Sequence, residues 1–304
     1  MVDFTIQTNH AYGGNTIIKN LFTPCHLTSF VVIALSMQWC AAEDGVLFFD
    51  DFSKPVLDRE QWTVVINGTV YNNEQQAYVD SEETIYVVHG DEAEGAANGA
   101  LVIHPRYAPK TKTTLGQQFD FISGRLHTKD KIEFTYGSIS ARIKLPDSST
   151  GLWPAFWALG NGTWPETGEI DIMEYVGEKD WIGVALHGPG YSGDTPVINK
   201  FFFDAGTDAT DWHVYSADWT KDQIVFKIDD RIIYRVTRTM VEHYGKWVFD
   251  SPEHLILNFA LGGGYSFKVN GLKKPYFGLA EETVALVKEG KARMLIDWVK
   301  VTQP

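Results

Sequence analysis

Three carboxylates stand within six residues of one otherwise apolar stretch, Gly168-Glu169-Ile170-Asp171-Ile172-Met173-Glu174-Tyr175. In a β-strand successive side chains point to opposite faces, so Glu169 and Asp171 share one face and the two isoleucines the other. Strict alternation would place Glu174 on the isoleucine face, where an unpaired carboxylate is costly. We therefore predict a β-bulge near Met173, which returns Glu174 to the face of Glu169 and Asp171.

Two carboxyls on one face of a rigid strand, with a third between them, suit the hydrolysis of a glycosidic bond. In a retaining mechanism the nucleophile and the acid/base stand roughly 5–5.5 Å apart. Repulsion between close carboxylates keeps one of them protonated, as an acid catalyst requires. The alternative is an acidic strand that only solvates a surface. Flanking Trp, Ile, Met and Tyr residues disfavour that alternative.

The elements that must position these carboxylates are mostly strands. Short runs of β-branched and aromatic residues recur, separated by Asn-Gly, Asp-Asp and similar turn signals. Helical spacing favours a helix only at 280–289. Many short strands with few helices predict a β-sandwich of two sheets. The expected strands are 46–52, 62–66, 100–104, 124–129, 134–145, 153–159, 168–176, 182–187, 201–203, 213–219, 223–228, 232–237, 254–261 and 294–302.

Composition narrows the class of partner. The chain has 304 residues and a net charge of −13, which repels nucleic-acid phosphates and anionic membrane surfaces. A neutral polymer remains a suitable substrate. Aromatic residues make up 13% of the chain, including ten Trp; they suit both a β-rich core and a sugar-binding cleft.

The first 42 residues differ from the rest. Residues 27–37 form an apolar run too short to span a membrane, and Cys40-Ala41-Ala42 follows as a small-residue cleavage site. We expect residues 1–42 to be a signal segment, with a disordered tail as the alternative, and residues 43–304 to be one catalytic domain. A secreted or periplasmic protein follows, and we take a monomer as the default.

Three tryptophans near the carboxylates are candidates for stacking on sugar rings. Trp153 and Trp157 are four residues apart and share a face if their segment is a strand. Trp157 suits the core and a sugar platform equally well. Trp153 and Trp164 stand beside Gly or Pro in loop-like contexts, which favours sugar stacking.

Taken together, these motifs resemble glycoside hydrolase family 16, most closely its laminarinase-type endo-β-1,3-glucanases. The resemblance implies a β-jelly-roll of two curved antiparallel sheets with a concave substrate cleft. It also implies a retaining enzyme acting on β-glucan, with Glu169 as nucleophile, Glu174 as acid/base and Asp171 tuning both, and with no cofactor required for catalysis. The segments that carry the resemblance are 151–157, 164–177, 186–193, 247–250, 255–263 and 296–301.

The resemblance carries over to further residues. Asn73 matches an asparagine that reaches a glucose on the non-reducing side, and Arg125 an arginine that donates to sugar hydroxyls. His187 matches a histidine near the leaving group, and Asn258 is expected on a strand crossing the concave face. The first three have plain structural alternatives: a turn asparagine for Asn73, a salt-bridged arginine for Arg125 and a structural histidine for His187.

A structural calcium ion is also implied, because many family members hold one away from the cleft. The matching positions are the carboxylate of Asp297 and backbone oxygens near Asp51 and Gly99. Calcium accepts such a mixture of carbonyl and carboxylate ligands. The alternative for Asp297 is a solvent-facing residue of the last strand.

Other activities remain open at this point. The extra residue at Met173 separates the chain from lichenan-specific members, but agarases and κ-carrageenases share it. A sulfated substrate would require basic residues in the cleft, whereas the motif surroundings are aromatic and acidic. A mixed-linkage glucanase, a transglycosylase and a glucan-binding protein without activity are the further alternatives.

Overall fold

The computed structural model describes residues 45–67 and 71–304. The expected signal segment, residues 1–42, lies outside the described residues. Residues 42–304 group as one unit. Within the described ranges, no helix is long and apolar enough to cross a membrane.

Strands dominate the described chain, as the sequence predicted. The helix expected at 280–289 is confirmed as α3, whereas α1, α2 and the strands β3, β4, β6 and β7 were not predicted. The elements are β1 Val46–Asp50, β2 Thr63–Val64, β3 Gln76–Tyr78, β4 Ile85–Val88, the 3₁₀-helix η1 Gly90–Ala93, β5 Ala100–Ile103, β6 Arg106–Lys112, β7 Gln118–Ser123, β8 Arg125–His127, β9 Gly137–Lys144, β10 Leu152–Gly160, β11 Glu169–Glu174, β12 Trp181–His187, β13 Val197–Phe202, β14 Trp212–Trp219, β15 Gln223–Ile228, β16 Arg231–Thr237, α1 Arg238–Glu242, β17 Glu253–Leu261, α2 Gly263–Asn270, α3 Glu281–Lys288 and β18 Met294–Thr302.

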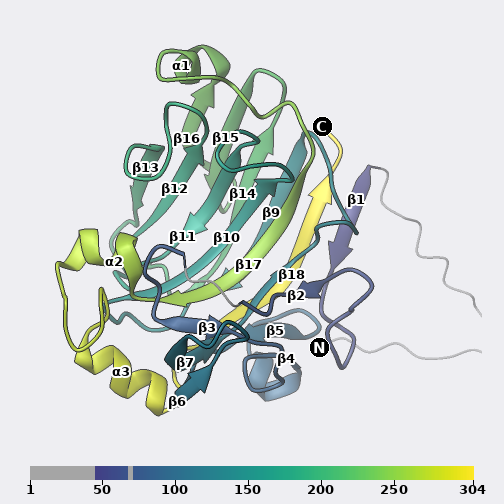
Figure 1. Cartoon of the computed structure of the whole chain (residues 1–304). Coiled ribbons are helices and arrows are strands. Elements are labelled where there is room, and N and C mark those ends of the chain that lie inside the picture. The colour runs from purple at the N-terminus through teal and green to yellow at the C-terminus, as the bar shows by residue number, and fades with distance from the viewer. Residues whose placement is uncertain (1–44, 68–70) are drawn as a thin grey trace, which may run out of the picture. The chain divides into compact units, whose positions relative to one another are not determined.

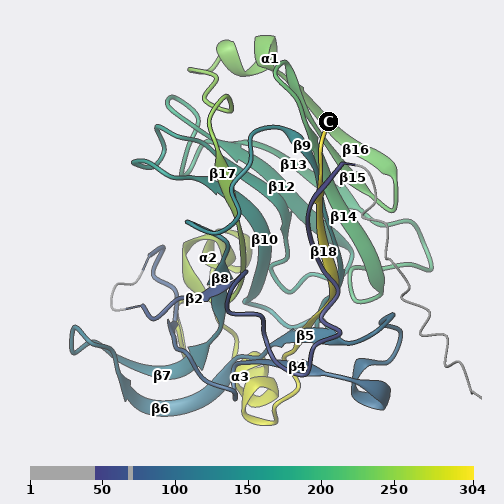
Figure 2. The same cartoon turned by 90° about the vertical axis from the view of Figure 1, so that its right-hand side faces the viewer.

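Two large sheets pack against each other (Figures 1 and 2). The eight-stranded sheet has the order β16-β15-β14-β9-β18-β5-β4, with β1 paired to β18. The seven-stranded sheet has the order β13-β12-β11-β10-β17-β8-β2. All pairings within these two sheets are antiparallel. The jelly-roll sandwich expected from the sequence is confirmed, and β11 lies near the middle of one sheet.

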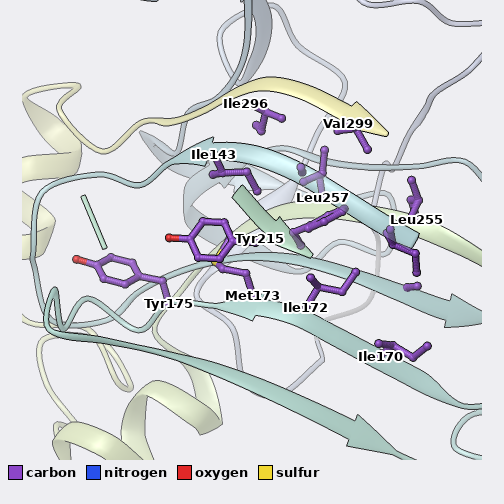
Figure 3. Packing of buried hydrophobic residues seen from close by; sticks show 14 of the residues in the cluster. Ile143, Ile170, Ile172, Met173, Tyr175, Tyr215, Leu255, Leu257, Ile296 and Val299 are labelled. Atoms are coloured by element: carbon purple, nitrogen blue, oxygen red, sulfur yellow. The ribbon is translucent and has the colours of Figure 1, made fainter. Parts of the chain in front are cut away.

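The hydrophobic core fills the space between the two sheets. From β11, the side chains of Ile170, Ile172 and Met173 point into it and belong to the same buried cluster as Ile143 of β9 and Ile296 of β18 (Figure 3). All five are at most 1% exposed. Burying such a side chain contributes roughly 1.5–3 kcal/mol. This face of β11 therefore points inward. The remaining residues of the strand lie on the opposite face, which we call the site face of the seven-stranded sheet.

Helix α2 follows β17 through two glycines in left-handed backbone conformations. Gly262 has φ 60° and Gly263 has φ 87°, values that glycine adopts without strain. A Cβ at Gly263 would lie 3.3 Å from the Trp153 ring and 3.0 Å from a backbone oxygen. Because Gly263 has no Cβ, α2 can pack close to Trp153. Trp153 in turn lies near the end of β11 that carries Glu174.

Candidate active site

The β-bulge predicted near Met173 is confirmed by the strand register. Along the β11–β12 pair, Asp171 stands opposite Ala185 and Glu174 opposite Gly183. Two residues of β11, Ile172 and Met173, therefore face one residue of β12, which defines a bulge. Both bulge residues are buried in the core, and Glu174 lies on the site face together with Glu169 and Asp171.

The three carboxyls of β11 are desolvated, and their pKa values are raised. Burial raises the pKa of Glu169 to about 8, and the nearby Asp171 charge adds to the effect. Burial likewise raises the pKa of Glu174 to about 8, again with a contribution from Asp171. Burial raises the pKa of Asp171 itself to about 7. The cluster therefore titrates jointly near neutral pH and retains protons there.

Trp153 and Trp157 both lie on the site face of β10, but their indoles contact different partners. Trp153 Nε1 donates to Glu174 Oε1 at 3.0 Å. Trp157 Nε1 donates to Asn258 Oδ1 at 2.7 Å, and the Arg125 guanidinium stacks on the Trp157 ring at 4.9 Å. Trp153 thus contacts a proposed catalytic group directly, whereas Trp157 and its partners form the neighbouring floor.

His187 extends the carboxylate cluster from β12. Its Nε2 lies 3.2 Å from Asp171 Oδ2 and 3.8 Å from Glu169 Oε1. Its Nδ1 accepts a hydrogen bond from the Gly193 backbone at 3.2 Å. Because Nδ1 is an acceptor, Nε2 carries the proton. Asp171 Oδ2 nevertheless has no hydrogen-bond partner among the described residues, so His187 borders the carboxyls without a hydrogen bond to Asp171.

Trp164 lies at the rim of the site. It is 46% exposed, its ring centroid is 6.1 Å from that of His187, and its hydrogen bond to Glu169 opposes the rise in the pKa of that carboxyl. Asn73 has a left-handed backbone with φ 55° and is exposed. Its backbone oxygen accepts from Gln75 Nε2, which is consistent with a turn residue.

Sequence reasoning missed two polar residues beneath the Trp157 side of the site. Glu74 Oε2 accepts hydrogen bonds from Tyr78 Oη at 3.0 Å and Gln76 Nε2 at 2.7 Å. Tyr78 Oη accepts in turn from Asn258 Nδ2 at 3.1 Å. Burial raises the pKa of Glu74. These residues hold the Asn258 side chain in place. They belong to the Asn72–Tyr78 segment, in which the sequence analysis identified only Asn73 as a site residue.

A further missed residue, Glu253, lies behind the nucleophile candidate. It is 0% exposed, and neither carboxyl oxygen has a hydrogen-bond partner among the described residues. Its Oε1 lies 3.2 Å from the position that a Cβ on Gly168 would take. Burial raises the pKa of Glu253 well above its ordinary value, and the charges of Glu169 and Asp171 add to the rise. Burial and the neighbouring carboxyls therefore both favour the protonated form of Glu253.

The residues expected to hold calcium do not form a suitable donor set in this arrangement. Asp297 is 2% exposed; its Oδ1 accepts from the Ala97 backbone, and its Oδ2 pairs with Arg142 at 2.5 Å. Asp51 accepts from the Ser53 backbone and from Asn98. The arginine supplies the positive charge that a cation would bring, so Asp297 has its counter-ion already. Calcium stays a prediction that the geometry does not favour.

A two-sheet antiparallel sandwich that presents two glutamates and an aspartate on one outward face has the arrangement of a carboxylate-dependent glycoside hydrolase. The comparison with protein families agrees: a family model described as glycosyl hydrolases family 16 matches residues 70–271. The chain belongs to this family and is a glycoside hydrolase.

Several known proteins with similar sequences or structures are named as glucanases or glucosidases acting on glucan. A β-glucanase from Rhodothermus marinus is 32% identical over 232 residues, covering 72% of this chain and 76% of that protein. A glucan endo-1,3-β-glucosidase A1 from Niallia circulans is 31% identical over 246 residues, covering 73% of this chain and 34% of that longer protein. The X-ray structure of an endo-β-1,3-glucanase from Pyrococcus furiosus superimposes with a TM-score of 0.71 at 32% identity, covering 85% of this chain and 94% of that one.

Proposed function

We propose that this protein is a retaining endo-β-1,3-glucanase. The observation that carries the proposal is the bulge of β11, which brings Glu174 to the face of Glu169 and Asp171. The names of the similar proteins supply the substrate class. Aromatic side chains surround the carboxyls, as a neutral glucan requires.

In the proposed mechanism Glu174 acts first as acid and then as base. Its proton goes to the departing glycosidic oxygen while Glu169 attacks the anomeric carbon from the opposite face, and the C–O bond to the leaving sugar breaks. Water then loses a proton to Glu174 and displaces Glu169, so the product keeps the β configuration. Asp171, whose Oδ2 lies 3.2 Å from His187 Nε2, tunes the protonation of both glutamates through its charge.

The roles of the surrounding residues are part of the same proposal. Trp153 orients the acid through its hydrogen bond to Glu174. Trp157 and Arg125 offer a flat, polar-edged platform for the adjacent sugar, and Asn258 holds the Trp157 indole in place. Trp164 offers an exposed ring at the rim, and Asn73 is assigned to the non-reducing side by its match to the family motif alone.

The roles of the two glutamates are tested by substitution at each position. Glu174→Ala should lose about 10²–10⁴-fold in turnover of laminarin, the range that acid/base assistance supplies. Glu169→Gly should be inactive, and added azide should restore turnover of an activated β-glucosyl donor and yield a product of inverted configuration. Glu166→Ala, at an exposed position of the preceding turn, is the matched control. Normal laminarin turnover by Glu174→Ala would refute the assignment.

Substrate choice is tested by product analysis on laminarin, lichenan, agarose and carrageenan side by side. We expect laminarin to be cleaved fastest into a series of oligosaccharides, which would establish endo action. Binding of laminarin without release of reducing ends would instead support the glucan-binding alternative. Products longer than the starting oligosaccharide would support a transglycosylase.

We propose further that residues 1–42 are removed as the protein leaves the cytoplasm, and that the mature monomer acts in the periplasm or medium. The apolar run and the small-residue site after it support this proposal. N-terminal sequencing of exported protein should begin at Glu43. Accumulation of the intact chain in the cytoplasm would contradict it.

A further inference from the structure

A group of basic side chains lies on the outer face of the eight-stranded sheet, whereas the carboxyls belong to the other sheet. The register pairs Met294 of β18 with Ile103 of β5, and both side chains lie in the core. Arg293 and His104 are the next residues along the two chains, so they point to the outer face. Tyr86, which packs on that face, places its hydroxyl 2.9 Å from His104 Nδ1.

Arg106 of β6 completes this group, and we call His104, Arg106 and Arg293 the basic cluster. Arg106 Nη1 lies 3.2 Å from His104 Nε2 and 3.4 Å from His104 Nδ1, so the guanidinium is held against the imidazole. Along residues 45–67 and 71–304, neither arginine of the cluster forms an ion pair or donates to a carbonyl. Most of their hydrogen-bond donors therefore have no partner in the protein.

The charge of the basic cluster is not compensated. Burial lowers the pKa of His104 to about 4, and the charges of Arg106 and Arg293 lower it further. No carboxyl of the described chain is among the groups that act on this histidine. His104 is thus uncharged near neutral pH and lies beside two guanidinium charges. This is an isolated positive site on a chain whose net charge is −13.

The end of helix α3 accounts for the position of Arg106 but not for its free donors. A Cβ on Gly290 would lie 3.3 Å from Arg106 Nη1, and the last carbonyls of a helix attract cations. However, the carbonyls of residues 285–287 already accept hydrogen bonds from the backbone amides of residues 289–291. The guanidinium therefore does not cap the helix, and its donors remain available to a ligand.

Basic residues continue from the cluster along β6 and α3, which lie side by side in both views (Figures 1 and 2). Lys288 Nζ lies 4.4 Å from the centroid of the Tyr107 ring, which is 37% exposed. Lys110 and Lys112 are exposed on β6, and no acidic residue occurs between 104 and 113. The surface is therefore longer than a single small anion and suits an extended ligand.

We propose that the basic cluster binds an oxyanion group, a sulfate ester or a carboxylate, carried by an acidic polysaccharide. The planar fork of a guanidinium matches the paired oxygens of such groups. Lys288 attracts the next charge along the polymer, and the exposed Tyr107 ring contacts a sugar face. Because charges are screened beyond about 8 Å at physiological salt, the local positive sign decides at contact. Nucleic acid, with its denser charge, is repelled more strongly by the acidic remainder of the protein.

The test measures binding of dextran sulfate, polygalacturonate, neutral dextran and inorganic sulfate by calorimetry at two salt concentrations. We expect at least one acidic polymer to bind about tenfold or more tightly than inorganic sulfate, more weakly at higher salt, and neutral dextran not to bind. Arg106→Gln and Arg293→Gln should each weaken binding of that polymer about tenfold, the effect of one lost charge-assisted hydrogen bond. Arg106→Lys, which keeps the charge but not the fork, should fall between wild type and Arg106→Gln.

Arg235→Gln is the matched control, because it removes one positive charge from an exposed position of β16, where the guanidinium donates to Gln223. It should change binding by less than about twofold. Equal losses in Arg235→Gln and the two cluster variants, or no loss in either cluster variant while Tm is unchanged, would overturn the site. Inorganic sulfate bound as tightly as the polymers would refute the polysaccharide as the ligand. Binding is measured without catalysis, so its outcome is independent of the proposed glucanase activity.

Discussion

Replacement of Trp153 by Phe tests how the structure sets the protonation of the acid. The substitution removes one donor, the Nε1–H that reaches Glu174 Oε1 at 3.0 Å. It keeps a ring against Tyr265, whose centroid is 5.6 Å from that of Trp153. The hydrogen bond favours the ionised carboxylate and lowers the pKa of Glu174. Without it, the pKa must rise.

The size of the rise follows from the difference between two hydrogen bonds. A bond to a charged group contributes about 1.5–3 kcal/mol and a neutral one about 0.5–1.5 kcal/mol. Trp153 therefore favours the ionised form of Glu174 by roughly 1–1.5 kcal/mol, or about one pKa unit. Since the acid must be protonated to act, its pKa sets the alkaline limb of the kcat/KM profile.

The assay is kcat/KM on a soluble laminari-oligosaccharide measured across the pH range. Trp153→Phe should move the alkaline limb upward by about one pH unit, with a smaller change in the acid limb. Trp157→Phe is the matched control, because its indole donates to Asn258 and not to a carboxyl of β11. An unmoved alkaline limb in Trp153→Phe, or an equal movement in Trp157→Phe, would refute this reasoning.

Three further substitutions probe the charges around the site. Asp171→Asn removes a charge that raises the pKa of both Glu169 and Glu174, so both limbs of the kcat/KM profile should move to lower pH. Glu253 has a folded pKa above its unfolded value, so the stability that its protonated form contributes declines as pH rises above about 4.3. Glutamine cannot ionise, so Glu253→Gln should have a higher Tm than wild type at pH 8 but not at pH 4. Asp297→Asn breaks a buried ion pair and should cost about 3 kcal/mol in urea unfolding, while EDTA should leave the wild-type Tm unchanged.

The sequence was sufficient to predict the bulge because two local rules conflict there. Alternation sends Glu174 inward, and the cost of an unpaired buried charge sends it outward. Only an extra residue satisfies both, and the structure places Ile172 and Met173 together in the core to provide it. The β-sandwich was predictable as well, because the alternation of strand residues and the turn residues between strands are local features of the sequence.

Contacts between residues far apart in sequence were not predictable. Asp297 pairs with Arg142 across 155 positions, and neither residue has a local signal for the pair. Glu253 stands before an apolar run like any residue at the start of a strand, so its complete burial follows only from the packing. Helix α2 has a weak helical pattern and starts at two glycines, which sequence rules assign to a turn. Tyr265 was missed with it.

The register of β11 also explains why the acid needs the bulge in this position. The smallest residues opposite the three carboxyls are those beside Glu174. On β12 the partners become smaller along the strand, from His187 to Ala185 to Gly183, and on β10 Leu159 and Trp157 give way to Ala155. One residue less in β11 would remove Glu174 from its place between the two smallest neighbours and turn it toward the core. The bulge and the small residues beside it therefore act together: one aims the acid outward, and the others leave the space in which a leaving sugar can reach it.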